Sequence, residues 1–200
     1  INEYPSKKEM ISRTAWVGGI HHYELGTVDD PKETLIYFDK YLNLLFEKEE
    51  IFGAKRVGII YCEQENGSGG WTTDKIQELI GKYMLSQGIL KSKGTVAIMT
   101  DKFTGYVRMK ESLRPDCDVM AEIIPTSETQ LIRDLNNPNH SCSIVLVINK
   151  GKAGMNVLPM KQTFSFRNTD KKSSSTFDYE SITESAKQQI GRCMRIWTGE

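Results

Sequence analysis

Two arginines near the end of the sequence have the clearest capacity for chemistry. They stand in the stretch QQIGRCMRIWTG, in which Gln188 and Gly191 precede Arg192, and Arg195 follows three residues later. The planar guanidinium group of arginine pairs bidentately with phosphate oxygens and stays charged. Arginines that reach a transferred phosphoryl group can accelerate its transfer by several orders of magnitude. The stretch is therefore a candidate phosphate-binding element.

The spacing of these residues places them on one face of a helix. At about 100° of rotation per residue, Gln188, Arg192 and Arg195 share a narrow polar sector, and Gly191 beside them permits close approach to the backbone. The opposite, apolar sector holds Ala186, Ile190, Cys193, Met194 and Trp197. A capping box at 181–184 predicts where the helix begins. The pattern leaves two interpretations open: an ordinary amphipathic helix with a solvated basic face, or a set of phosphate contacts.

The elements that must position this helix follow an α/β pattern. Short apolar runs predict strands, and apolar residues at helical spacing predict helices. The predicted strands are 56–61, 95–99, 119–124, 143–148 and 162–166, and the predicted helices are 31–46, 74–87, 127–135 and the one that begins at 181. Apolar runs that alternate with helices indicate parallel strands buried on both faces. We therefore expect an open, mostly parallel sheet flanked by helices.

Bulk composition excludes some function classes. Lysine plus arginine and aspartate plus glutamate each number 26, so only a local basic site can attract a nucleic acid. No apolar run reaches the length of a membrane span. The cysteines and histidines are scattered (Cys62, Cys117, Cys142, Cys193, His21, His22 and His140) and predict no metal site. Free thiols of this kind favour a reducing, cytoplasmic location.

The motifs of a complete ATPase are missing from the sequence. It contains no G-x-x-x-x-G-K-[ST] and no Asp-Glu dipeptide. The glycine-rich stretch Gly67–Gly70 is followed by Trp71, with no lysine to reach a phosphate. The chain therefore lacks both a phosphate cradle and the carboxylates that hold magnesium.

The order of motifs resembles the second lobe of superfamily 2 helicases and translocases. Gln188-x-x-Gly191-Arg192-x-x-Arg195 is similar to the sixth motif of that superfamily. The stretch VINKGKAGMNVLPMKQTFSF, with Gly154, Asn156 and a proline at 159, resembles the fifth motif, in the E-G-x-D-x-P form of restriction-enzyme motor subunits (type III Res-like).

The resemblance extends upstream and covers residues 50–200. Residues 56–63 resemble the strand of the fourth motif, and residues 121–148 resemble the strand–helix–strand that leads into the fifth. Two positions depart from the pattern. Asn156 stands where the family usually has aspartate, and Ala153 stands where it often has glutamate or arginine.

The resemblance implies a RecA-like lobe that works with a partner lobe. ATP with Mg²⁺ would be held mainly by a first, N-terminal ATP-binding lobe of the same polypeptide, which this chain lacks. Arg192 and Arg195 would reach the γ-phosphate, with Gln188 beside them as a hydrogen-bonding sensor. Gly154 and Asn156 would contact the sugar of the nucleotide or couple the nucleotide site to the nucleic-acid site, and Gly191 would also contact the cofactor. The isolated chain would then not hydrolyse ATP.

The resemblance also implies DNA or RNA as a partner. Ligands of open α/β sheets sit beyond the carboxyl ends of the strands, where hydroxyls, backbone amides and lysines bind phosphates without reading sequence. The candidates at these ends are Thr100, Lys102, Ser127, Lys150 and Lys152, with Thr126 and the glycine-rich loop beside them. Ser127 also has an ordinary explanation as a helix cap.

Two further functions stay open. One is a non-motor regulatory α/β module that binds a nucleotide or a protein. The other is a small-molecule enzyme, which would need a polar catalytic set such as a paired histidine and aspartate, whereas His140 stands alone.

We divide the chain into two parts. Residues 1–50 form an N-terminal extension with a strand or hairpin and a helix, and residues 51–200 form the helicase C-terminal domain. We expect the chain to be a piece of a longer polypeptide.

Overall fold

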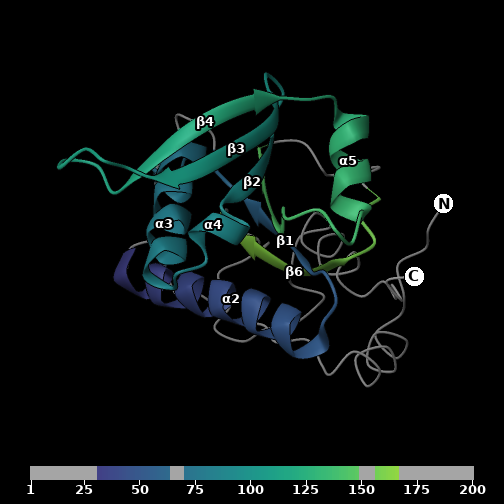
Figure 1. The fold of residues 1–200 in the computed structure, drawn as a ribbon, viewed down its shortest axis with the longest axis horizontal. Coiled ribbons are helices and arrows are strands. Elements are labelled where there is room, and N and C mark those ends of the chain that lie inside the picture. Colours follow the sequence, from purple (N-terminus) through teal and green to yellow (C-terminus); the bar gives the residue numbers. More distant parts are fainter. Residues whose placement is uncertain (1–30, 64–69, 149–155, 167–200) are drawn as a thin grey trace, which may run out of the picture.

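A six-stranded sheet forms the centre of the described part of the protein, which comprises residues 31–63, 70–148 and 156–166 of a computed structural model. Its order is β4-β3-β2-β5-β1-β6. The strands are β1 Val57–Tyr61, β2 Thr95–Met99, β3 Thr104–Glu111, β4 Val119–Pro125, β5 Ile144–Val147 and β6 Met160–Ser165. The helices are α2 Pro31–Phe52, α3 Thr73–Ser86, α4 Leu90–Lys93 and α5 Glu128–Asn136 (Figure 1).

The sheet is mostly parallel, as predicted. β1 pairs in parallel with β5 and β6, and β2 pairs in parallel with β5. β3 pairs antiparallel with both β2 and β4, so β4 again runs in the direction of β2. The α/β class and the flanking helices are therefore confirmed.

The prediction for the strand at 119–124 was wrong in one respect. β4 exists, but its residues are almost all exposed, and it pairs antiparallel with β3 instead of lying buried among parallel strands. The sequence analysis also missed β3, whose buried Val107 and Met109 alternate with exposed Arg108 and Lys110. That period of two was the available signal.

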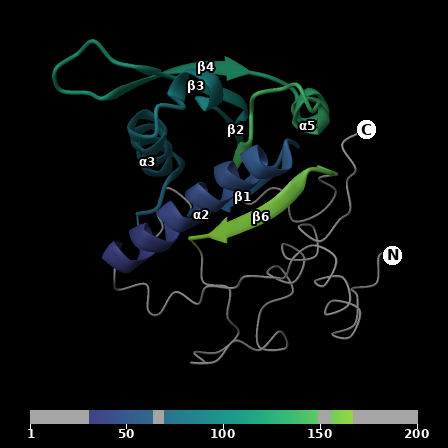
Figure 2. The ribbon, with the colours of Figure 1, turned by 60° about the horizontal axis from the view of Figure 1, so that its bottom comes forward.

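Two apolar layers cover the two faces of the sheet. One contains α2, α3 and α4, whose side chains pack with Ile60, Ile98 and Leu146. The other contains α5, whose Leu131 and Leu135 pack with the alternate strand residues. The views in Figures 1 and 2 show α3 and α5 well apart, on either side of the sheet. No helix in the described ranges is long and apolar enough to cross a membrane.

Helix α2 belongs to the same core as the sheet. Its Phe38, Leu42 and Leu45 are at most 1% exposed, and α2 crosses close to β1 at Gly58. A side chain at Gly58 would collide with the Tyr41 hydroxyl, so glycine allows the helix to approach the strand. The division of the chain after residue 50 stays a prediction, although α2 shares its core with the sheet.

Candidate functional site

The edge of the sheet at the carboxyl ends of the strands gathers the starts of two helices. Because β1, β2, β4, β5 and β6 point the same way, the segments that follow them meet at this edge, which we call the carboxyl edge. α3 begins there with Thr72, which accepts a hydrogen bond from the Lys75 backbone N–H. α5 begins there with Ser127, which accepts one from Gln130. Helix N-termini favour anions, so this edge suits phosphates.

The described residues that follow two adjacent central strands, β1 and β5, pack on opposite faces of the sheet. After β1 the chain runs to α3, on the face that carries α2. After β5 it reaches Val157, which packs on the face that carries α5. In open α/β sheets this divergence marks the position where ligands bind. The carboxyl ends of β1 and β5, next to Cys62 and Ile148, are therefore the central candidate position.

Thr100 and Lys102 lie in the turn between β2 and β3. The Thr100 hydroxyl accepts hydrogen bonds from the backbone N–H groups of Lys102 and Phe103, at 3.2 and 2.9 Å. It also donates to the Phe103 carbonyl at 3.2 Å. These bonds explain Thr100 as the residue that shapes the turn, while Lys102 is exposed.

The residues that were predicted to contact a ligand and that the structure describes lie close to one another, with one exception. The Thr126 N–H donates to the Thr104 carbonyl at 3.1 Å, which places the start of α5 beside the turn that holds Thr100. The Ile148 N–H donates to the Met99 carbonyl at 3.0 Å, so the stretch that resembles the fifth motif begins at the same place. The structure thus brings Thr100, Lys102 and Ser127 to one edge.

The exception is Asn156, which lies near the other end of α5. Its backbone carbonyl accepts a hydrogen bond from Asn136, the last residue of that helix, whereas Ser127 precedes the first. Nine residues of helix span about 13 Å. Asn156 and Ser127 are therefore separated by the length of α5.

The residues on either side of the glycine-rich stretch after β1, Glu63 and Trp71, are hydrogen-bonded to each other. The Trp71 N–H donates to a carboxylate oxygen of Glu63, and the Glu63 N–H donates to the Trp71 carbonyl, both at 3.0 Å. The Lys75 ammonium group lies 4.1 Å from the centre of the Trp71 ring. A carboxylate at the base of this loop opposes phosphate binding, and Lys75 favours it.

Seven of the predicted site residues lie outside the described residues. They are Lys150, Lys152, Gly154, Gln188, Gly191, Arg192 and Arg195. Their roles stay predictions.

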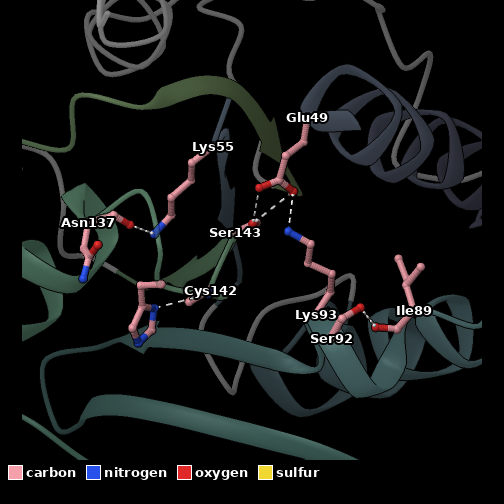
Figure 3. Close-up of polar contacts among 9 residues, drawn as sticks. Glu49, Lys55, Ile89, Ser92, Lys93, Asn137, Cys142 and Ser143 are labelled. Atoms are coloured by element: carbon pink, nitrogen blue, oxygen red, sulfur yellow. Dashed lines mark hydrogen bonds and ion pairs between the residues drawn. The ribbon is translucent and has the colours of Figure 1, made fainter. Parts of the chain in front are cut away.

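The opposite edge of the sheet carries a polar cluster that the sequence analysis did not single out. The Ser143 hydroxyl donates to both carboxylate oxygens of Glu49, at 3.2 and 3.3 Å, and the Lys93 ammonium group contacts the same carboxylate at 2.9 Å (Figure 3). The three residues come from α2, α4 and the segment before β5, so their contacts connect these three parts of the fold. Glu49 and Lys93 also line an open groove of about 650 Å³.

Lys55 closes the end of α5 at this same edge. Its ammonium group donates to the Asp134 carbonyl at 3.0 Å, and to the Asn137 carbonyl at 2.9 Å, the bond drawn in Figure 3. The residue is nevertheless only 6% exposed. A cation is favourable at a helix C-terminus. Burial nevertheless lowers the pKa of Lys55 from 10.5 to about 8.

The groups around Lys55 are also perturbed by burial. The Tyr106 hydroxyl donates to an Asp134 carboxylate oxygen at 2.7 Å, and burial together with this bond raises the pKa of Tyr106. Burial raises the pKa of Cys142 to about 11 and lowers that of His140, whose Nδ1 accepts the Cys142 N–H. This set lies away from the carboxyl edge, and each group has a structural partner. His140 therefore does not supply the strand-end catalytic pair that a small-molecule enzyme would need.

Replacing Lys55 with methionine is expected to change how stability depends on pH. Since the folded pKa of Lys55 is depressed, the unfolded chain holds a proton that the folded protein has lost between about pH 8 and 10.5. The contribution of Lys55 to stability therefore rises with pH in this window, by up to about 3 kcal/mol. Urea unfolding at a series of pH values measures the difference in free energy of unfolding between the wild-type protein and Lys55→Met. Cys142 and Tyr106 are present in both proteins, so their own titration does not contribute to this difference.

The control for this series is Lys91→Met, at an exposed lysine of α4. A stability difference between wild type and Lys55→Met that stays constant from pH 7 to 10.5 would contradict the depressed pKa. A difference that changes equally with Lys91→Met would mean that the effect is not specific to Lys55.

Within the described ranges, no group of three or more histidine, cysteine, aspartate or glutamate side chains is arranged to hold a metal ion. No protein-family model matches the chain, and comparisons with curated proteins and with solved structures gave no match.

Proposed function

We propose that this chain is the second, RecA-like motor lobe of an ATP-dependent nucleic-acid helicase or translocase. ATP and Mg²⁺ would be held mainly by a first lobe of the same polypeptide. Arg192 and Arg195 would reach the γ-phosphate from this lobe, with Gln188 beside them. The closing and opening of the two lobes would then move the protein along DNA or RNA.

One observation carries this proposal. The stretch that resembles the fifth motif starts from β5, and the stretch that resembles the sixth follows β6 in the sequence. β5 is the fully buried strand between β1 and β2, and it ends at the position where the chain diverges to opposite faces. Motifs in this order, carried by a mostly parallel sheet, are what a motor lobe requires.

The gathering of Thr100, Lys102 and Ser127 at the carboxyl edge supports the nucleic-acid part of the proposal. Hydroxyl groups, helix N-termini and lysines are the groups that bind a phosphate backbone without reading sequence. Charges of both signs are present there, since Asp101 and Glu128 adjoin Lys102 and Ser127. Binding would thus depend on geometry more than on net charge.

ATP hydrolysis by the natural polypeptide that contains this chain tests the proposal. We expect hydrolysis that single-stranded or double-stranded DNA, or RNA, accelerates, and none from residues 1–200 alone. The polymer that accelerates hydrolysis most identifies the track. A natural polypeptide that hydrolyses no ATP with any of these polymers would overturn the motor function in favour of the non-motor module.

A further inference from the structure

Strand β4 forms one margin of the described sheet (Figures 1 and 2). Among the described strands it pairs with β3 alone. It is seven residues long and carries two large apolar side chains that are exposed, Met120 at 45% and Ile123 at 66%. An edge strand with exposed apolar side chains offers its free backbone groups to a further strand.

The register between β3 and β4 determines which backbone groups of β4 point away from the sheet. The Thr126 N–H donates to the Thr104 carbonyl at 3.1 Å, just beyond the end of β4. In an antiparallel pair, residues bonded to the neighbouring strand alternate with residues whose N–H and C=O groups point to the other side. The even-numbered residues of β4 therefore bond to β3, and Val119, Ala121 and Ile123 direct their N–H and C=O groups outward.

These outward groups are complementary to those of a second β4. If two copies of β4 ran antiparallel with Ala121 opposite Ala121, Val119 would lie opposite Ile123 on both sides of the centre. All three outward residues would then exchange both of their hydrogen bonds with the second copy. Centring the pair one residue to either side would place Glu122 opposite Glu122 or opposite Asp118. Like charges directly opposite are destabilising, so the register centred on Ala121 is favoured.

The contacts of Val119 are compatible with a second strand. Its carbonyl accepts a hydrogen bond from the Cys117 thiol at 2.9 Å, which is a weak donor, and the second lone pair can accept an N–H of the second copy. Its side chain packs against α3, where a Cβ added at Gly81 would lie 3.1 Å from Val119 Cγ1. Ile123 points to the same face of the sheet. It would therefore cover Val119 of the second copy and extend this apolar layer across the pair.

The charges on the other face of β4 are also compatible with this register. Glu122 would lie opposite Met120 of the second copy. The Glu122 carboxylate is paired within its own chain, with Lys110 at 3.0 Å and Arg108 at 3.7 Å. Each carboxylate would thus keep its own cations and lie opposite an apolar side chain.

We propose that the margin formed by β4 is an interface between two copies of this chain, which pair antiparallel through residues 119–123 with Ala121 at the centre. The inference does not depend on the proposed motor function, because it uses none of the residues assigned to ATP or nucleic acid. The contact is confined to two short strands, whereas stable interfaces bury about 1,200–2,000 Å², so we expect a dissociation constant on the order of 10–100 μM.

Sedimentation velocity of the whole chain, from about 1 to 300 μM, measures this association. We expect monomers at the lowest concentration and dimers at the highest. Ile123→Lys should weaken the dimer at least about tenfold, because a lysine on an edge strand opposes pairing. Ile51→Lys is the matched control, since Ile51 is 60% exposed on α2, and it should leave the association unchanged. Both isoleucines are largely exposed, so neither variant should shift the urea midpoint.

Disulfide formation tests the register. Met120 would lie opposite Glu122 of the second copy at a position without inter-strand hydrogen bonds, where Cα atoms are about 4.5 Å apart, a separation that a disulfide can span. A mixture of Met120→Cys and Glu122→Cys should therefore form a disulfide-linked dimer under mild oxidation. Each variant alone should form no more than the wild-type chain, which sets the baseline for the native cysteines.

Several outcomes would overturn the inference. A chain that stays monomeric over the whole concentration range would exclude a second copy and leave the margin to a strand of another protein. A dimer that Ile123→Lys does not weaken, or that Ile51→Lys weakens equally, would place the interface elsewhere. Cross-linking of Glu122→Cys alone would contradict the centre at Ala121. None of these results bears on the motor function, which ATP hydrolysis tests separately.

Discussion

Replacing Arg192 with alanine is expected to reduce nucleic-acid-stimulated ATP hydrolysis by the natural polypeptide about 10³–10⁵-fold, the effect of removing an arginine finger. The arginine would neutralise charge that builds up on the γ-phosphate in the transition state, so its loss should lower kcat. Steady-state hydrolysis, with the nucleic acid at saturation, measures the effect. Arg195→Ala is expected to act in the same direction, because both arginines lie on the same predicted face.

Arg192→Lys decides whether the planar guanidinium group of Arg192 or only its positive charge is required, and Arg114→Ala is the control. Arg192→Lys keeps a positive charge but loses the bidentate geometry, so most of the activity should still be lost. Arg114→Ala removes an exposed arginine from the turn between β3 and β4 and should leave activity unchanged. Full activity in Arg192→Ala would identify the helix as a solvated basic face.

Local signals in the sequence were sufficient for most elements of the fold. The capping serine at 127 predicted α5, and the structure shows the Ser127 hydroxyl accepting the Gln130 N–H at 3.1 Å. The apolar run at 143–148 predicted β5, whose four residues are all buried. Caps and buried runs act over a few residues, so the sequence reports them directly.

Strand direction and burial depend on distant partners, and there the local signals failed. β4 is apolar enough to resemble a buried strand, yet nothing in 119–124 shows that it is an edge strand of the described sheet and pairs there with β3 alone. Ile123 is 66% exposed as a result. β3 was missed because its pattern includes charged residues and because no helix separates it from β2 or from β4.

The candidate site likewise contains residues that the sequence predicted and residues that it could not predict. The grouping of Thr100, Lys102 and Ser127 followed from the rule that ligands lie beyond the carboxyl ends of strands. Asn136 and Lys55 could not be foreseen, because each acts on a segment far away in the sequence. Asn136 binds residues 20 and 22 positions later, and Lys55 binds carbonyls 79 and 82 positions later.

Removing α2 is expected to abolish the cooperative fold. A chain that begins at residue 53 loses Phe38, Leu42 and Leu45, which are at most 1% exposed. Truncating one such side chain to alanine typically costs about 2–5 kcal/mol, and the three together approach the whole stability of a typical domain, about 5–15 kcal/mol. Urea unfolding of residues 53–200, followed by the fluorescence of the buried Trp71 and of Trp197, measures the outcome.

Single alanine substitutions in α2 show whether the loss of stability comes from buried side chains or from shortening the chain. Leu42→Ala should lower the free energy of unfolding by about 2–5 kcal/mol. Ile36→Ala, on the same helix but 55% exposed, should lower it by less than about 1 kcal/mol. Cooperative unfolding of residues 53–200 at the urea midpoint of the whole chain would instead support a separable extension that ends near residue 50.

Because α2 packs against β6, deleting α2 also bears on the proposed motor function. The Phe38 ring lies 5.2 Å, centre to centre, from both Phe164 and Phe166, which belong to β6 and the residue directly after it. The chain continues from there toward the stretch that carries Arg192. Loss of α2 should therefore remove ATP hydrolysis through unfolding, whereas Arg192→Ala should remove it while the urea midpoint stays unchanged. Comparing the two variants distinguishes a residue that acts on phosphate from a helix that only maintains the lobe.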